Sequence, residues 1–92
     1  MAIYLVSYDL QEQKDYPGLQ ARLEQFPRWA RPLRSQWLVE SNETAYDIAG
    51  ELKRYVDRAD RLLVSEITAE VSWYNLQIGD DAMLAWQDAA RR

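Results

Sequence analysis

The feature that most constrains the fold is an apolar run at residues 2–9 that ends in an acid. Ala2 to Tyr8 are rich in β-branched and aromatic residues, and Asp9 follows them directly. A short apolar run bounded by polar residues is typical of a buried central strand. We therefore expect residues 2–9 to form the first strand, with the Asp9 carboxylate at its exit.

The Asp9 carboxylate has two interpretations. An aspartate in a turn often accepts backbone hydrogen bonds and has no further role. The exit of a central strand is also a position from which a small α/β sheet can present a metal ligand. The chain contains no His and no Cys, so any metal would be held by oxygen ligands, which favours Mg²⁺, Mn²⁺ or Ca²⁺.

The next forty residues predict a helix followed by two strands. Asp15 is a good N-cap and Pro17 suits a first helical turn. An apolar face then runs from Tyr16 to a helix end near Pro27. Residues 29–41 are expected to be extended in two parts with a bend at Ser35. Pro32 cannot donate to a sheet ladder, so the first part must be an edge strand or bulged.

A second helix and a further strand complete a βαββαβ order. Thr44 and Asp47 have the spacing of a capping box, and an apolar face continues to Val56. Residues 62–68 are apolar enough for another strand. The order predicts an α+β, ferredoxin-like domain over residues 1–68, with an antiparallel sheet covered by two helices on one face.

Residues 69–92 are expected to form a C-terminal extension. The stretch from Glu70 to Gln77 predicts a short strand. Asp80 or Asp81 is expected to cap a final helix whose apolar side holds Ala82, Trp86 and Ala89. A helix this short is marginal alone, so it must pack on its own domain or on a partner subunit.

Composition excludes several classes of protein. Ninety-two residues make one domain, and 48% hydrophobic residues with four Trp and six Tyr are too apolar for a disordered chain. Dimerisation would bury some of this apolar surface. No stretch reaches transmembrane length and no signal peptide is visible. We expect a cytoplasmic homodimer without a membrane partner.

Charge points to one segment as a candidate nucleic-acid contact. The net charge of −4 argues against broad nonspecific DNA coating. Residues 20–40 nevertheless carry four arginines against two glutamates. Arg28, Arg31 and Arg34 are interleaved with Trp29, a pattern that can hold phosphates and stack bases. A solvated helix face gives the same pattern, so both interpretations stand.

Short motifs resemble a known group of proteins. Tyr8-Asp9 at the end of the first strand is similar to the corresponding dipeptide of the CRISPR-associated Cas-two family. The segment from Arg31 through Ser35 to Trp37 resembles that family's second-strand pattern. Together with the stretches 6–10, 35–39 and 60–64, these motifs resemble still more closely the SinR-like proteins, which are grouped with the Cas-two and VapD families.

The resemblance implies a fold, a partner and an activity. It implies a ferredoxin-like homodimer in which the two Asp9 side chains face each other and bind Mg²⁺ or Mn²⁺. Tyr8 and Ser35 would support this centre, and Arg31 would contact phosphate. The implied activity is metal-dependent cleavage of RNA or DNA, as a nuclease or a toxin-type ribonuclease. The alternative is a non-catalytic dimeric scaffold that binds protein or nucleic acid, which the thin acid inventory and the acidic net charge favour.

Overall fold

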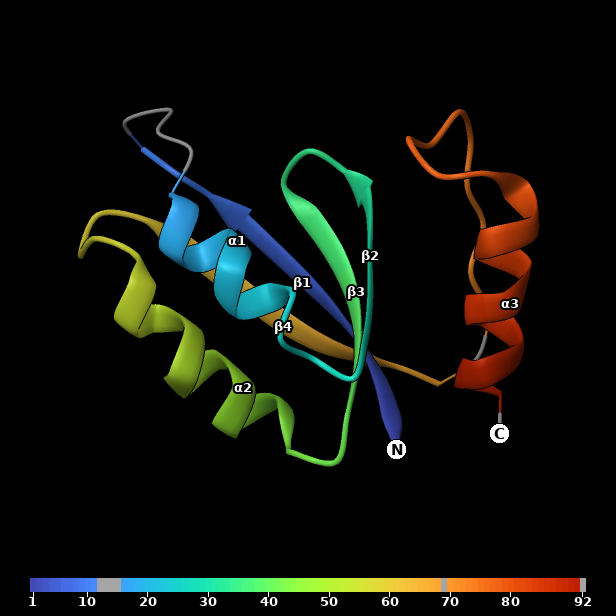
Figure 1. The fold of residues 1–92 in the computed structure, drawn as a ribbon, viewed down its shortest axis with the longest axis horizontal. Helices are drawn as coiled ribbons and strands as arrows, with labels where there is room; N and C mark the ends of the chain where they lie inside the picture. Colours follow the sequence, from blue (N-terminus) through green and yellow to red (C-terminus); the bar gives the residue numbers. More distant parts are fainter. Residues whose placement is uncertain (12–15, 69, 92) are drawn as a thin grey trace.

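The computed structural model describes residues 1–11, 16–68 and 70–91. The chain is a small α+β protein built on a four-stranded antiparallel sheet. Its elements, seen in Figure 1, are β1 (Ala2–Asp9), α1 (Pro17–Leu23), β2 (Arg28–Leu33), β3 (Gln36–Ser41), α2 (Ala45–Leu52), the 3-10 turn η1 (Lys53–Tyr55), β4 (Arg61–Ile67) and α3 (Asp80–Ala90).

The strands lie in the order β2-β3-β1-β4, so β1 is central and β2 and β4 are the edges. Tyr4 of β1 lies opposite Val39 of β3 and Glu66 of β4. Asp9, at the end of β1, lies opposite Arg61, the first residue of β4. This arrangement is compatible with a ferredoxin-like fold.

Local sequence signals explain several element boundaries. The Asp47 backbone N–H donates to the Thr44 hydroxyl (3.1 Å) and caps α2. Pro17 begins α1, where its missing N–H has no consequence. The β2–β3 register shifts between Ala30 and Leu33, around Pro32, as expected for a proline in an edge strand. The predicted cap Asp15 lies outside the described residues.

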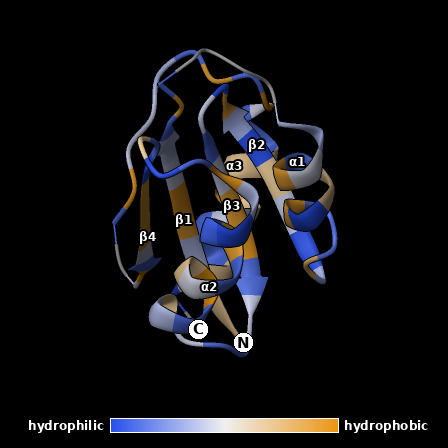
Figure 2. Ribbon diagram, turned by 90° about the vertical axis from the view of Figure 1, so that its left-hand side faces the viewer, coloured by the Kyte–Doolittle hydropathy of each residue, from blue (hydrophilic) through white to orange (hydrophobic). Residues whose placement is uncertain are grey.

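The sheet has an apolar core on each face. Even-numbered residues of β1, including Tyr4 and Val6, face α1 and α2 and pack with Leu19, Leu52 and Trp37. Odd-numbered Ile3 and Leu5 face the other way, toward α3. Figure 2 shows the strands between α2 in front and α3 behind. Both alternations of β1 are apolar because both faces of the sheet are covered.

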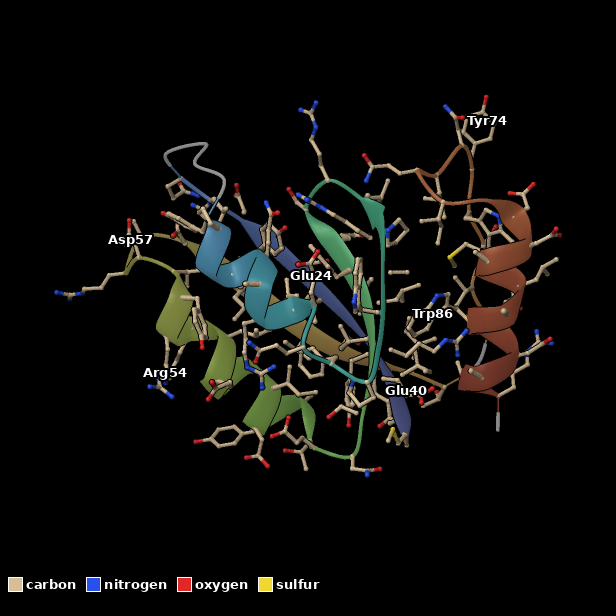
Figure 3. The ribbon with its side chains drawn as sticks, in the orientation of Figure 1. Glu24, Glu40, Arg54, Asp57, Tyr74 and Trp86 are labelled. Carbon is tan, nitrogen blue, oxygen red and sulfur yellow. The ribbon has the colours of Figure 1, made fainter. Side chains whose placement is uncertain are left out.

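One tryptophan is central to the apolar core between α3 and the sheet, here called the α3 core. Trp86 is buried with Ile3, Leu38 and Met83, and the Arg28 guanidinium lies 4.1 Å above its ring. Figure 3 shows Trp86 pointing from α3 toward the sheet. The sequence predicted two helices on one face and left open whether the final helix packs on its own sheet or on a partner, because a helix of this length carries no signal of which surface it covers. The structure places α3 on the opposite face of its own sheet. The boundary predicted at residue 69 lies outside the described residues.

The strand predicted between Glu70 and Gln77 is absent from residues 70–79, which form an irregular segment. Its apolar residues do not alternate between two faces, since Val71, Trp73 and Leu76 all pack on the α3 core. Asn75 adopts φ 54°, a left-handed conformation that interrupts an extended run.

Three helix predictions also need correction. Gly79 is the N-cap of α3, and Asp80 and Asp81 lie in the first turn rather than at the cap. The buried residues of α3 are Met83 and Trp86. Trp86 and Ala89 pack on the core as predicted, whereas Ala82 is exposed. Helix α1 ends at Leu23, because the last part of the predicted apolar face, near Phe26, belongs to the turn into β2.

Candidate functional site

Five of the six residues predicted for the site meet at one end of the sheet. A surface pocket, here called the strand-end pocket, lies where β1 ends beside the β2–β3 turn. It is lined by Tyr8, Asp9, Leu10, Arg31, Arg34, Ser35 and Gln77. The pocket therefore joins the exit of the central strand, the hairpin turn and the segment before α3.

Tyr8 fixes the β2–β3 turn against β1. Its hydroxyl accepts a hydrogen bond from Trp37 Nε1 (2.9 Å) and lies 3.3 Å from the Arg34 carbonyl oxygen, to which it donates. Its backbone N–H donates to the Ser35 carbonyl (3.0 Å). With both partners taken from the protein, the Tyr8 hydroxyl shapes the pocket wall and positions the turn.

Arg31 locks the same turn and places a fixed positive charge there. Its Nε and Nη2 both donate to the Arg34 carbonyl, at 3.0 and 2.6 Å. Its guanidinium also lies 5.2 Å from the centre of the Trp37 ring, a cation–π distance. An arginine held this way loses little side-chain entropy on meeting an anion, because its conformation is already set.

Arg34 and Ser35 are the groups that remain open to a ligand. Both side chains are exposed at the turn, and neither makes a hydrogen bond or ion pair with any residue that the structure describes. Arg34 can reach into solvent with all five of its N–H donors available. The hydroxyl of Ser35 offers a further donor at the same rim.

Asp9 is already paired with an arginine that no sequence motif indicates. Arg61 Nη1 lies 2.8 Å from Asp9 Oδ2, and both side chains are exposed. No group of three or more acidic, His or Cys side chains gathers within residues 1–11, 16–68 and 70–91. Among the described residues of one chain, the strand-end pocket therefore offers Mg²⁺ one carboxylate, that of Asp9, and this carboxylate is already paired with the Arg61 guanidinium.

The balance of charge in and beside the pocket is positive. Arg31, Arg34 and Arg61 contribute three positive charges, and Asp9 contributes one negative charge. The net value among these four described groups is +2, in a chain whose overall charge is −4. A local positive site on an acidic protein favours binding of an anion at this place and disfavours binding elsewhere.

Arg28 stands apart from the other predicted phosphate contacts. It begins β2, opposite Glu40, whereas Arg31 and Arg34 lie toward the far end of the hairpin. Its Nη1 lies 3.7 Å from Glu40 Oε2 and its guanidinium stacks on Trp86. Arg28 thus helps to hold α3 on the sheet and does not line the strand-end pocket.

The pocket also contains a residue from the C-terminal segment. The Gln77 backbone N–H donates to the Pro32 carbonyl (2.9 Å), and its side-chain Nε2 donates to the Arg31 carbonyl (3.2 Å). These bonds satisfy the irregular backbone of β2 around the proline. Aligning β1 and β4 in antiparallel register would have predicted Arg61 as the neighbour of Asp9. No sequence pattern predicts that Gln77 bonds to Pro32.

No protein-family model matches the chain, and no solved structure matches it. None of the helices in the described part is long and apolar enough to cross a membrane. The pocket is therefore interpreted from its own geometry.

Proposed function

We propose that the strand-end pocket binds phosphate groups of a single-stranded nucleic acid, and that the protein is a nucleic-acid-binding module. The observation that carries the proposal is the β2–β3 turn. It presents one arginine fixed by the Arg34 carbonyl and the Trp37 ring, and beside it a second arginine without a partner among the described residues. Guanidinium groups match phosphate geometry with paired N–H donors.

An aromatic surface next to the turn supports a single strand as the ligand. Trp29 lies on β2, its ring centre 5.3 Å from that of Trp37, and remains 41% exposed. Arg31 packs on Trp37 from the same neighbourhood. The exposed Trp29 indole is joined to Arg31 through the Trp37 ring between them, so it can stack an unpaired base while the arginines of the turn hold the backbone further along the strand.

We further propose that the fold is ferredoxin-like and that the resemblance to the Cas-two and VapD group reflects shared architecture. Support comes from the element order and the strand order β2-β3-β1-β4. The motif residues that carry the resemblance also lie close together, with Tyr8 at the end of β1 bonded to Trp37 at the start of β3. These motif residues bond to one another and stabilise the β2–β3 turn. Their arrangement therefore supports a binding site better than a complete catalytic centre.

Fluorescence anisotropy with labelled RNA and DNA single strands tests the binding proposal. Arg34→Ala should weaken binding several-fold at low salt and lower the salt slope by about 0.7 to 1, since one phosphate contact is lost. Arg58→Ala is the matched control, because Arg58 is also exposed but lies outside the pocket. Equal losses in the two variants, or no binding by the wild-type chain, would refute the proposal.

Metal-dependent cleavage is the second candidate function. Its favouring observation is that the exposed Asp9 carboxylate lines the same pocket as both arginines. Two such carboxylates from two subunits would hold Mg²⁺ or Mn²⁺, and the metal would supply polarisation of a phosphodiester and activation of water. Within residues 1–11, 16–68 and 70–91, one chain supplies too few ligands for this chemistry.

A cleavage assay separates the two functions. The wild-type protein and Asp9→Asn are incubated with RNA and with double-stranded DNA in Mg²⁺, Mn²⁺ or EDTA. The variant should fold normally, since an exposed ion pair contributes only about 0 to 1 kcal/mol. For a binding module we expect no cleavage and equal or tighter binding by Asp9→Asn, whose pocket has lost a negative charge. Metal-dependent cleavage that Asp9→Asn abolishes would establish the second candidate instead.

A further inference from the structure

The two edges of the sheet differ in how they are protected. The β2 edge contains Pro32 and a shifted register. The β4 edge pairs with β1 without interruption from Ile67 to Arg61 and contains no proline and no lysine. Within the described part, no backbone hydrogen bond reaches β4 from any segment other than β1. A regular, unprotected edge strand is a template for another strand.

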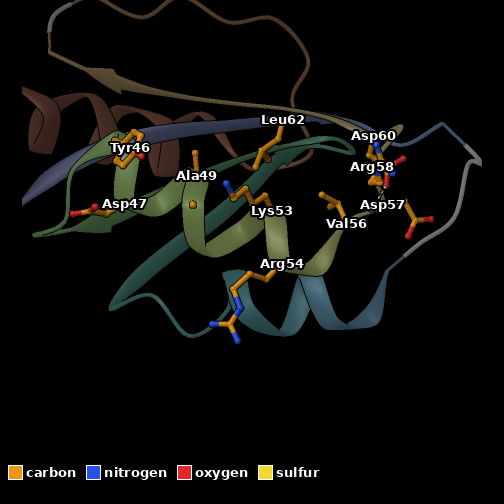
Figure 4. Close-up of a pocket in the computed structure, with 11 residues that line it drawn as sticks. Tyr46, Asp47, Ala49, Lys53, Arg54, Val56, Asp57, Arg58, Asp60 and Leu62 are labelled. Carbon is orange, nitrogen blue, oxygen red and sulfur yellow. Dashed lines mark hydrogen bonds between the residues drawn. The ribbon is translucent and has the colours of Figure 1, made fainter.

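A groove runs beside this edge on the α2 face. Tyr46, Ala49 and Gly50 of α2 and Lys53 at the start of η1, spaced at i, i+3, i+4 and i+7, line it together with Leu62 of β4. Figure 4 shows Tyr46, Ala49 and Lys53 along the helical segment, with Leu62 above Lys53. A Cβ added at Gly50 would meet nothing within 4 Å. The two small residues at the middle of α2 therefore leave room for the backbone of another helix.

We propose that a second copy of this chain occupies the β4 edge and the groove. In this dimer β4 pairs antiparallel with β4 of the second copy, and α2 packs antiparallel on α2 of the second copy. The sheet becomes continuous across a two-fold axis. This proposal does not depend on the strand-end pocket binding nucleic acid.

Charge on α2 is complementary to itself in this arrangement. Asp47 and Lys53 lie three residues before and three residues after Gly50, and neither side chain makes an ion pair within the described residues. A two-fold axis near Gly50 places each Asp47 opposite Lys53 of the second copy. It also brings each Tyr46 ring near Arg54 of the second copy. A self-complementary patch of this kind is what a two-fold interface requires.

The opposite face of β4 gains an apolar contact. Leu63 points away from α2 and is 63% exposed, which is unusual for a leucine within a strand. A two-fold axis at Leu63 places the two leucines together and sets Arg61 opposite Ser65 of the second copy. Apolar cross-strand pairs stabilise neighbouring strands. At the end of the paired region the same register sets Glu66 opposite Asp60 of the second copy, an acid pair that opposes the apolar contact.

This dimer keeps the two strand-end pockets separate. From one Asp9 to the other the path crosses three strand spacings and four residue steps, which together give a separation of about 20 Å. Two Asp9 carboxylates at that separation cannot share a metal ion. The β4 dimer and the Asp9-facing dimer implied by the family resemblance are therefore mutually exclusive.

Disulfide trapping tests the interface, because the chain contains no Cys and each variant then has one. Gly50→Cys and Leu63→Cys should each cross-link into a covalent dimer on oxidation, since both positions lie at the axis. Leu84→Cys, on the exposed side of α3, and Asp9→Cys are the matched controls and should stay monomeric on a non-reducing gel. Sedimentation velocity of the wild-type chain should show a dimer that dissociates on dilution.

Gly50→Arg provides an independent test. The monomer has open space at this position, so the variant should keep the wild-type circular dichroism spectrum and sediment as a monomer. A Gly50→Arg chain that remains dimeric, or a wild-type chain that is monomeric at the highest concentration tested, would overturn the proposal. Preferential cross-linking of Asp9→Cys over Gly50→Cys and Leu63→Cys would also overturn it, in favour of the Asp9-facing arrangement.

Discussion

Trp86→Ala should be among the most destabilising single changes in this chain. The side chain is 5% exposed and is central to the apolar core beneath α3. Removing a buried tryptophan side chain costs about 3 to 5 kcal/mol, and losing the Arg28 stack adds about 0.5 to 1 kcal/mol. A loss near 4 kcal/mol is large beside the roughly 5 to 14 kcal/mol expected for a domain of this size. It corresponds to a fall in Tm of roughly 20 °C.

Urea titration followed by far-UV circular dichroism measures this loss without relying on tryptophan fluorescence. Tyr74→Ala is the control, since Tyr74 is 91% exposed (Figure 3) and its loss should change the free energy of unfolding by less than about 0.5 kcal/mol. A Trp86→Ala effect below about 1 kcal/mol would refute the packing of α3 on this sheet. An effect that appears only at dimer-forming concentrations would place α3 on a partner subunit instead.

Two further predictions concern pH and the middle of α2. Burial raises the pKa of the Tyr4 phenol, and burial with hydrogen bonds to Asp60 and Asp57 raises that of Tyr16. The phenols of the unfolded chain ionise first, near pH 10, so the free energy of unfolding should fall as the pH rises above about 10. Tyr16→Phe should make that fall less steep in urea titrations between pH 8 and pH 11. Gly50→Ala should raise the free energy of unfolding by about 0.5 to 1 kcal/mol, measured at a concentration where the chain is monomeric, because the helix gains propensity and the new Cβ meets no atom within 4 Å. A loss of stability there would mean that the groove is filled by this chain itself.

Local signals in the sequence predict most of the sheet and its helices. The apolar run to Asp9, the Thr44 cap and Pro32 each act over a few residues, and the structure has β1, α2 and the irregular β2 edge where these signals place them. The C-terminal segment depends on contacts across the fold. The stretch from Glu70 to Gln77 predicts a strand, but packing of its apolar residues on the α3 side of the sheet and the bond from Gln77 to Pro32 give it an irregular path.

The candidate site was predictable to the same extent. Tyr8, Asp9, Arg31 and Ser35 come from motifs at the ends of adjacent strands, so a correct sheet order brings them together. Arg28 belongs to the same basic segment, but six residues of extended strand carry Arg34 and Arg28 to opposite ends of the hairpin. Charge composition cannot separate a phosphate contact from an arginine that stacks on Trp86. The strand register separates the two kinds of arginine, because it places Arg28 at the end of the hairpin that is far from the turn.

The chemistry of Asp9 depends on how two chains meet, and this links the cross-linking and cleavage experiments. With its Arg61 partner at 2.8 Å, Asp9 of one chain leaves the strand-end pocket positive and suited to phosphate. A dimer through β4 preserves that state in both subunits, so Gly50→Cys cross-linking should accompany binding without cleavage. A dimer through the strand ends would set two carboxylates together, and a divalent cation would then relieve their repulsion. In that case Asp9→Cys cross-linking should accompany metal-dependent cleavage. Cross-linking through Gly50 together with cleavage that needs Asp9 would contradict the requirement for two carboxylates, and would move the search for the missing ligands to other residues of the same chain.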